Sequence, residues 1–227
     1  MPLPAGTVQA VREWPQEQAC AVQDVHSAQG ITVISVATPV TTDRIDARAL
    51  VRNALRQTLG AFLGQPATSI ALVSQPGRPL AVTSSPVHLG LSVSHAPGLS
   101  LAAMARGACV GVDVMRVEDG VEANADWLRV ARDYLGPQAA ARLQATSAAS
   151  CPVAFVLAWT QLEARLKCLG LPLTEWSPQL GAQLATCQVW TLDFAHSPAG
   201  ALATSGHFLG SVAVRTHAMG DFRPLHR

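Results

Sequence analysis

The chain has 227 residues, of which 49% are hydrophobic and 14% are charged, against roughly 25% charged residues in an average soluble domain. This composition excludes a disordered, collagen-like or disulfide-scaffold chain, and the length allows one large domain or two small ones. The net charge is +1, so no global field attracts nucleic acid or an anionic membrane surface. Any anion-binding site must therefore be local.

The lysine and cysteine content bears on the binding chemistry and on the cellular compartment of the protein. Lys167 is the only lysine among the sixteen positive residues, and an ammonium is not equivalent to a guanidinium at a bonded site. The five cysteines are odd in number and form no C-x-x-C pair, which is typical of buried thiols in a reducing compartment. The first residues lack a basic, apolar leader and no apolar run reaches the length of a membrane span, so the cytoplasm is the expected location.

The first elements follow from strand and cap signals. Residues 1–30 are interrupted by three prolines and give only a possible short strand over 19–25. The β-branched run 31–37 predicts a strand. Thr41, Thr42 and Asp43 are N-cap candidates for a helix that should run to about Leu63.

One face of this helix carries a basic stripe. Arg44, Arg48, Arg52 and Arg56 recur every four residues, while leucines occupy another face. Surface arginines at helical spacing are ordinary, so a solvated helix face is the more common explanation of such a stripe. An anion site remains the alternative.

The rest of the chain alternates between short strands and helices. Strands are expected over 70–74, 91–94, 99–105, 109–115, 187–194 and 207–215, and helices over 126–135, 138–144 and 153–169. Arg106-Gly107 is a plausible tight hairpin connection, because glycine accepts the positive φ of such turns. In the last helix Phe155, Trp159, Leu162, Leu166 and Leu169 form one apolar stripe, and Gly170 is the expected stop.

This order of elements predicts an α+β fold of two similar halves in tandem, each a helix packed on a short antiparallel sheet. The expected division is an uncertain segment 1–30, an N-terminal half 31–113 and a C-terminal half 114–227. The repeat is one of element order and not of residue identity.

Three segments carry candidate chemistry: SVSH at 92–95, GVDV at 111–114 and WTQLEARLK at 159–167. A carboxylate within an apolar strand needs a hydrogen-bonding partner or a metal, which singles out Asp113. Glu163 and Lys167 lie one helical turn apart, and without further context a local ion pair is the simpler explanation. Neighbouring residues on a strand point to opposite faces, so His95 cannot readily activate Ser94 as a nucleophile.

In this order and spacing the segments resemble the 4'-phosphopantetheinyl transferase superfamily, in its larger, Sfp-like, single-chain two-half branch. That family shows a Ser-His at a strand end, a G-[IV]-D-[IV]-E strand and a W-x-x-K-E-A-x-x-K helix. The turn GRP at 77–79 resembles the family's Gly-Lys-Pro turn, and YLGPQ at 134–138 resembles its aromatic-x-x-Pro-Glu segment. The resemblance covers about residues 40–175.

The resemblance implies a holo-acyl-carrier-protein synthase type of reaction. The 4'-phosphopantetheine arm would pass from coenzyme A to a serine of an apo acyl or peptidyl carrier protein, with release of adenosine 3',5'-bisphosphate. Asp113 and Glu163 would hold Mg²⁺, which binds through one or two carboxylates plus phosphate. Lys167 would neutralise the leaving phosphate, and Glu163 could also act as the general base, directly or through a water.

The family pattern also implies residues that bind coenzyme A. An arginine on the first long helix contacts the nucleotide, for which Arg48 is the best positional match and Arg52 the next. Arg78, Ser94 and His95 would contact the 3'-phosphate and the adenine-ribose end.

Two positions depart from the family pattern. Met115 stands where the family has a second metal carboxylate, and a thioether is a poor Mg²⁺ ligand. Leu162 replaces the usual lysine before the catalytic glutamate, and its place in the apolar stripe gives a structural reason for it. The alternative function is therefore a non-catalytic module that binds coenzyme A or a carrier protein. A monomer is the expected state, with no nucleic-acid or membrane partner.

Overall fold

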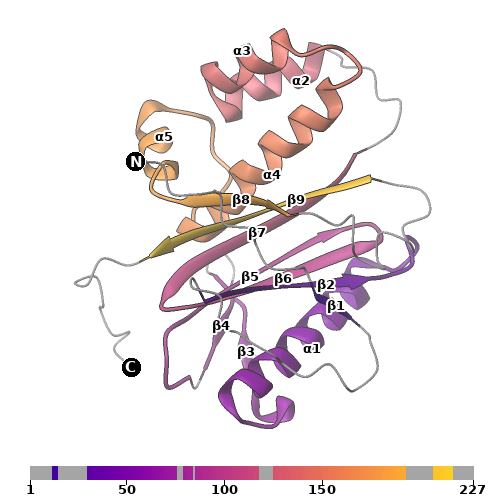
Figure 1. Cartoon of the computed structure of the whole chain (residues 1–227), viewed down its shortest axis with the longest axis vertical. Coiled ribbons are helices and arrows are strands. Elements are labelled where there is room, and N and C mark those ends of the chain that lie inside the picture. Colours follow the sequence, from indigo (N-terminus) through magenta and orange to yellow (C-terminus); the bar gives the residue numbers. More distant parts are fainter. Residues whose placement is uncertain are drawn as a thin grey trace.

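The computed structural model describes residues 30–75, 79–83, 85–117, 125–192 and 207–216, together with the backbone of 12–14. The expected strand over 19–25 lies outside these residues. The described part combines helices with small sheets, as the α+β prediction required. Figure 1 shows two sheets in the middle of the molecule, with one long helix on the outer side of each.

The first sheet has the strand order β1-β2-β6-β5. β2 (Ile31–Ala37), β5 (Leu89–Ala96) and β6 (Leu99–Arg106) pair antiparallel, while β1 (Arg12–Trp14) pairs parallel with β2. A separate pair joins β3 (Leu72–Val73) to β4 (Ala81–Val82). The strands expected over 31–37, 91–94 and 99–105 are all present in the first sheet.

The second sheet has the order β7-β9-β8 and is antiparallel throughout. It consists of β7 (Ala108–Val117), β8 (Gln188–Leu192) and β9 (His207–Thr216). The division expected between residues 113 and 114 falls inside β7, which pairs with β9 over its whole length.

The prediction of a hairpin at Arg106-Gly107 is wrong. Gly107 does have a positive φ of +68°, but β6 and β7 are not paired there, because β6 lies between β2 and β5 and β7 pairs with β9. The turn therefore carries the chain from one sheet to the other.

The first long helix, α1 (Arg44–Leu63), begins after Asp43, one of the three N-cap candidates, and ends at Leu63 as expected. The Asp43 carboxylate accepts hydrogen bonds from the amides of Ile45 and Asp46, and Gly64 ends the helix in the left-handed region. The buried residues of α1 pack on one face of the first sheet in a single core: Val51, Ala54, Leu55 and Leu59 from the helix, with Ile34, Val36, Leu91, Ala102 and Met104 from the strands.

The second long helix, α4 (Cys151–Leu169), covers the outer face of the second sheet. It ends at Gly170, which is also left-handed. Shorter helices surround it: α2 (Ala125–Val130) runs into a π-helical turn (Ala131–Leu135), followed by α3 (Pro137–Ala145) and by α5 (Pro178–Leu184). The sequence analysis missed α5. Leu162 and Leu166 of α4 pack with Leu180 and Leu184 of α5, which explains the leucine at position 162.

The two sheets face each other across a third apolar core. Alternate residues of β6 and β7 point into it, including Leu101, Ala103, Val110 and Val112, and Val212 joins them from β9. The opposite residues of each strand face α1 or α4. The molecule thus has four layers, with the sheets inside and α1 and α4 outside (Figure 1).

Gly111 of β7 sets how closely α4 approaches the second sheet. A Cβ at this position would overlap the carbonyl oxygen of Ala164 and the amide nitrogen of Cys168, both of which are backbone atoms that cannot rotate away. Because α4 carries Glu163 and Lys167, this contact also fixes the height of both side chains above β7.

We predict that Gly111→Ala lowers the free energy of unfolding by roughly 3 kcal/mol or more, because α4 must move off the sheet. Gly64→Ala is the matched control: its φ of +66° is strained for alanine, but nothing lies within 4 Å of the added Cβ, and the expected loss is about 1 kcal/mol. Urea unfolding of both variants checks this. Equal losses would contradict the tight contact.

Candidate active site

The site is built where β5 of the first sheet runs against β7 of the second. The Ser92 hydroxyl accepts a hydrogen bond from the amide of Val112 at 3.0 Å, and the Ser94 hydroxyl accepts one from the amide of Val114 at 3.3 Å. Both serines are buried and lie two residues apart, so they point to the same face of β5. Serine side chains thus replace the backbone ladder between these two strands and bring Ser94 beside Asp113.

Asp113 is 7% exposed and has its charge balanced within the protein. Its Oδ1 accepts a hydrogen bond from the Ser94 hydroxyl at 2.6 Å and lies 2.7 Å from Lys167 Nζ. The partner that a carboxylate in an apolar strand requires is therefore the lone lysine of the chain, whose side chain is 31% exposed.

Lys167 Nζ is held by three acceptors. Besides Asp113, it donates to the Ser94 hydroxyl at 3.2 Å and to the carbonyl of Val112 at 3.3 Å. These three bonds match the three donors of an ammonium. The local ion pair between Glu163 and Lys167, which was the simpler explanation of their spacing, is therefore wrong. Among the described residues, Lys167 of α4 forms its ion pair with Asp113 of β7.

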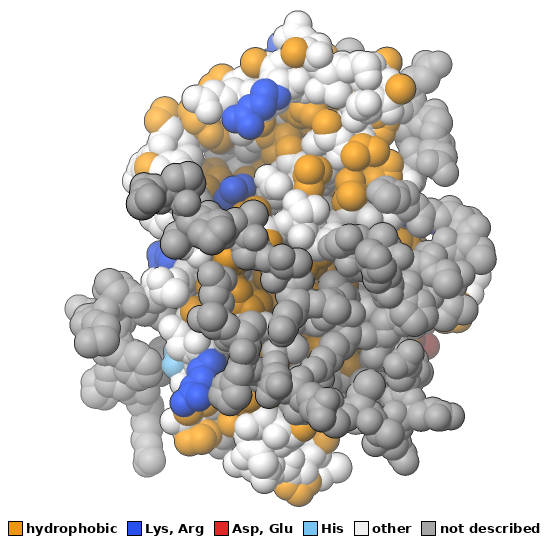
Figure 2. Space-filling view, viewed as in Figure 1, with side chains coloured by type: hydrophobic (Ala, Val, Ile, Leu, Met, Phe, Trp, Pro, Cys, Tyr) orange, Lys and Arg blue, Asp and Glu red, His pale blue; other side chains and the backbone are white. Residues whose placement is uncertain are grey.

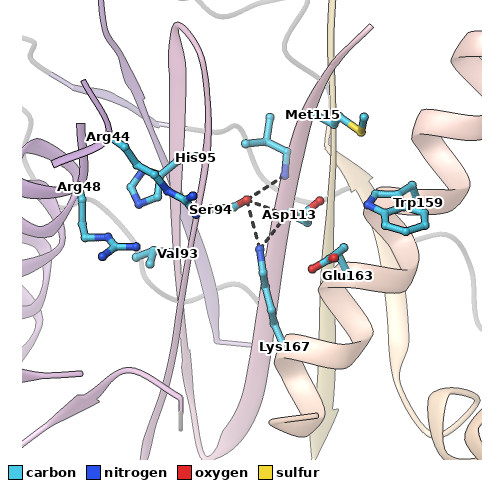
Figure 3. Close-up of a pocket in the computed structure, with 11 residues that line it drawn as sticks. Arg44, Arg48, Val93, Ser94, His95, Asp113, Met115, Trp159, Glu163 and Lys167 are labelled. Atoms are coloured by element: carbon cyan, nitrogen blue, oxygen red, sulfur yellow. Dashed lines mark hydrogen bonds and ion pairs between the residues drawn. The ribbon is translucent and has the colours of Figure 1, made fainter. Parts of the chain in front are cut away.

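Glu163 lies one turn before Lys167 on α4, and its side chain faces the same cavity as Asp113 (Figure 3). Burial and the negative charge of Asp113 raise the pKa of the Glu163 carboxyl, while the charge of Lys167 opposes this rise. The two carboxylates therefore interact electrostatically across the cavity.

The cavity has a volume of about 400 Å³ and opens between α1, β5, β7 and α4. Arg44 and Arg48 of α1 line one side and Glu163 and Trp159 of α4 line the other, with His95 and Asp113 on the strands between them (Figure 3). The two arginines thus lie at one end, while Lys167 lies with the carboxylates at the other. The near-zero net charge requires only that any anion site be local, and the arginines of this cavity are candidates for it.

His95 lines this cavity and carries one ring nitrogen without a hydrogen-bond partner among the described residues. Its Nδ1 lies 2.9 Å from the Ser100 hydroxyl, while Nε2 is buried and has no hydrogen-bond partner among the described residues. Burial, followed by the positive charge of Arg48, lowers the pKa of His95 to about 4. The neutral imidazole therefore adds no positive charge to the cavity that it lines.

A second hollow of about 510 Å³ adjoins the first and shares Val93 and Lys167 with it. Arg52 lines it from α1, and Gly170 and Leu171 line it from the end of α4. Arg48 therefore lines the cavity and Arg52 the adjoining hollow, while Lys167 lines both.

Aromatic side chains form the wall beyond Glu163. Trp159 stacks on Phe155 with ring centroids 5.8 Å apart and meets Tyr134 edge-on at 5.9 Å. Met115 packs in the same apolar cluster and also lines the cavity. The thioether therefore occupies an apolar surface at the position where the family has a carboxylate.

The residues present fit a hard divalent cation held by two carboxylates. Asp113 and Glu163 come from separate elements and line one cavity. Burial first, and the negative charge of Asp113 second, raise the pKa of Glu163, and a bound cation would oppose both effects. Within the described residues, no group of three or more His, Cys, Asp or Glu could hold a metal ion. Other ligands would have to come from water and substrate.

Most residues predicted from the sequence meet here. The structure brings Ser94, His95, Arg48, Asp113, Glu163 and Lys167 to the main cavity and Arg52 to the adjoining hollow. Arg78 lies outside the described residues. Within them, the sequence analysis did not single out Arg44 or Trp159 as site residues. The arginine spacing could have indicated Arg44, since it precedes Arg48 by one turn.

Comparison with known proteins agrees with this geometry. Residues 109–207 match the family model of the 4'-phosphopantetheinyl transferase superfamily. The matched stretch contains Asp113, Glu163 and Lys167. Among curated proteins, none matches the chain.

Two observations concern larger surfaces. No helix in the described ranges is both long and apolar enough to cross a membrane. On the face shown in Figure 2, the described Lys and Arg side chains lie apart from one another and form no broad basic patch.

We predict that His95 stays neutral down to about pH 5, because its folded pKa of about 4 lies below the usual value of 6.5. Protons then bind more tightly to the unfolded chain between these values, so the stability that His95 contributes is complete above pH 6.5 and is lost as pH falls toward 4. Histidine NMR titration gives the pKa directly. His95→Gln should unfold with a weaker pH dependence in this window; an unchanged dependence would contradict the assignment.

Proposed function

We propose that the protein transfers the 4'-phosphopantetheine arm of coenzyme A to a serine of an apo acyl or peptidyl carrier protein, releasing adenosine 3',5'-bisphosphate. The observation that carries this proposal is the meeting of Asp113, Glu163 and Lys167 in one cavity opposite the arginines of α1, within the stretch that matches the transferase superfamily. This is a holo-acyl-carrier-protein synthase type of reaction.

Each end of the cavity suits one end of this reaction. Arg48 and His95 are placed to bind phosphate and nucleotide groups, since a guanidinium and an imidazole N–H both donate to phosphate oxygens. Arg52 would bind the part of coenzyme A that enters the adjoining hollow. Arg78 follows from the family resemblance alone. The Ser94 hydroxyl donates its proton to Asp113, so in addition to contacting coenzyme A it would hold the Asp113 carboxylate in position.

At the other end, Lys167 is placed to neutralise the phosphate that leaves with the nucleotide. Its ammonium already has three acceptors, so a phosphate oxygen would replace one of them. Glu163 would orient the carrier serine and accept its proton, directly or through a water. Mg²⁺ held by Asp113 and Glu163 would supply electrostatic stabilisation of charge developing on the pyrophosphate.

We further propose that the chain consists of two similar halves in tandem, as expected of the single-chain branch. Its support is that α1 packs on the first sheet and α4 on the second, which gives each half one long helix and one small sheet. Such a chain would act as a monomer. The free thiols of Cys151, Cys168 and Cys187 fit a reducing compartment, and we place the reaction in the cytoplasm.

The deciding experiment is intact mass spectrometry of apo carrier proteins after incubation with this protein, coenzyme A and Mg²⁺, with an EDTA control. We expect a metal-dependent gain of one phosphopantetheine arm. No gain across fatty-acid, polyketide and peptide carriers, with coenzyme A binding retained, would favour the second candidate: a non-catalytic module that binds coenzyme A or a carrier. The packing of Met115 among apolar side chains favours this alternative.

Glu163→Gln should reduce transfer roughly 100-fold or more, because it removes both a metal ligand and the proton acceptor while keeping the shape of the side chain. Glu175→Gln is the matched control, since it makes the same change on an exposed residue outside the cavity. The rate of carrier modification is measured for both. Full activity of Glu163→Gln would remove this residue from the mechanism.

Met115→Glu should tighten Mg²⁺ binding roughly tenfold, because affinity rises with the number of charged ligands. Residues 113 and 115 lie two apart on β7 and face the same side of the strand, so the new carboxylate would reach the cavity that Met115 already lines. Titration calorimetry with Mg²⁺ alone measures this without catalysis. Unchanged affinity would contradict the alignment of Met115 with a metal ligand.

A further inference from the structure

Two buried hydroxyls join α4 to the second sheet, and neither of them lines the cavity. Thr160 of α4 and Ser211 of β9 are both 0% exposed, and their side-chain oxygens lie 3.0 Å apart. The Thr160 oxygen also lies 3.1 Å from the carbonyl oxygen of Leu157 in the same helix, which can only accept a hydrogen bond. Thr160 therefore donates to Leu157, and Ser211 donates to Thr160.

Ser211 lies directly opposite Asp113 in the second sheet. The two residues are register partners in the antiparallel pair of β7 and β9, and opposite residues of such a pair project from the same face. That face is the one on which α4 packs. Two side-chain links therefore join α4 to one register position of the sheet: Thr160 to Ser211, and Lys167 to Asp113.

The spacing along α4 relates these two links to each other. Thr160 and Lys167 lie seven residues apart, which is about two turns and about 10.5 Å along the helix axis. Helical side chains lean toward the N-terminus, so the long Lys167 side chain reaches back toward Thr160. Its Nζ meets Asp113 at 2.7 Å. A slip of α4 by one residue, about 1.5 Å, would exceed the range over which such a bond is kept.

The close contact at Gly111 does not set the position of α4 along the sheet. Gly111 brings the backbone of Ala164 and Cys168 near β7, but a glycine has no side chain that would resist sliding. A hydrogen bond constrains both distance and angle. Because Thr160 and Ser211 are buried, breaking their bond would leave a polar group unpaired in the protein interior, at a cost in free energy.

We propose that the hydrogen bond between Thr160 and Ser211 is a positioning contact of the site: it fixes where α4 lies on the second sheet and thereby brings Lys167 onto Asp113. Both hydroxyls act through other residues, so they are positioning residues and not catalytic ones. The proposal holds for whatever reaction the cavity performs. Only its effect on the transfer rate rests on the proposed function.

The test uses the full chain, produced with lysine that carries a nitrogen isotope on its side chain. Because Lys167 is the only lysine, the NMR spectrum contains one side-chain ammonium signal. The hydrogen exchange rate of this signal measures how firmly Asp113, Ser94 and Val112 hold the ammonium. We expect Thr160→Val to raise the rate roughly fivefold, the factor that corresponds to one net hydrogen bond. An unchanged rate in the folded variant would overturn the proposal.

Three further variants separate positioning from general destabilisation. Thr160→Ser keeps the hydroxyl and should keep the parent's exchange rate. The double variant Thr160→Val with Ser211→Ala leaves neither hydroxyl unpaired, so it decides the question even where Thr160→Val alone does not fold, and it should exchange faster than the parent. Thr58→Val is the matched control, because the Thr58 hydroxyl bonds to the carbonyl of Ala54 within its own helix, α1.

Thermal unfolding of each variant checks that it folds. The control should exchange at the parent's rate. A parent-like rate in the double variant would assign the effect of Thr160→Val to the unpaired hydroxyl, and a fast rate in Thr160→Ser or in Thr58→Val would assign it to something other than the link. Each of these results would contradict the proposal.

The transfer assay gives a second readout. The double variant should lower kcat roughly tenfold and leave the KM for coenzyme A within about twofold, because the reacting groups of α4 shift while the arginines of α1 stay in place. A raised KM with an unchanged kcat would overturn the positioning role. If the parent transfers nothing to any carrier, the proposed function fails, whereas the exchange rate of Lys167 still decides this inference.

Discussion

The site depends on the contact between β5 and β7. These strands belong to different sheets, and the hydroxyls of Ser92 and Ser94 accept backbone amides of β7 in place of ladder bonds. A buried amide without such an acceptor would cost free energy, so each serine is held in place. Gly90 adds to this, because a Cβ there would overlap the backbone of β7. As a result, the cations of α1 and the carboxylates of β7 and α4 line one cavity.

In that cavity the arginines of α1 lie opposite Glu163, and Lys167 joins α4 to β5 and β7. Arg44 and Arg48 stand on the side of the first sheet, and Glu163 on the side of the second. Lys167 crosses the gap, since it starts from α4 and ends on Asp113, Ser94 and the backbone of β7. A ligand with several phosphates could therefore contact Arg44 or Arg48 on one side of the cavity and Lys167 on the other.

The sequence predicted the elements whose signals are local. Asp43, one of three N-cap candidates, begins α1, and Gly170 ends α4 as expected, because caps depend only on adjacent residues. It failed where pairing is distant: Gly107 looked like a hairpin turn, but the partner of β7 is β9, far along the chain. The need of Asp113 for a partner was correctly inferred from burial. That the partner is Lys167 and not a residue nearby in sequence depends on how α4 docks at Gly111, which no local pattern shows.

Lys167 is the only lysine of the chain, so a reagent that reacts with side-chain amines can modify this residue selectively. In most proteins, acylating reagents modify many surface lysines and report nothing about one position. Here the side-chain amine that such a reagent can reach stands in the cavity, partly exposed and bonded to Asp113. The extent of labelling at this residue would thus measure how often that bond opens, and any cavity ligand that shields the amine could be ranked by the protection it gives, whatever reaction the cavity performs.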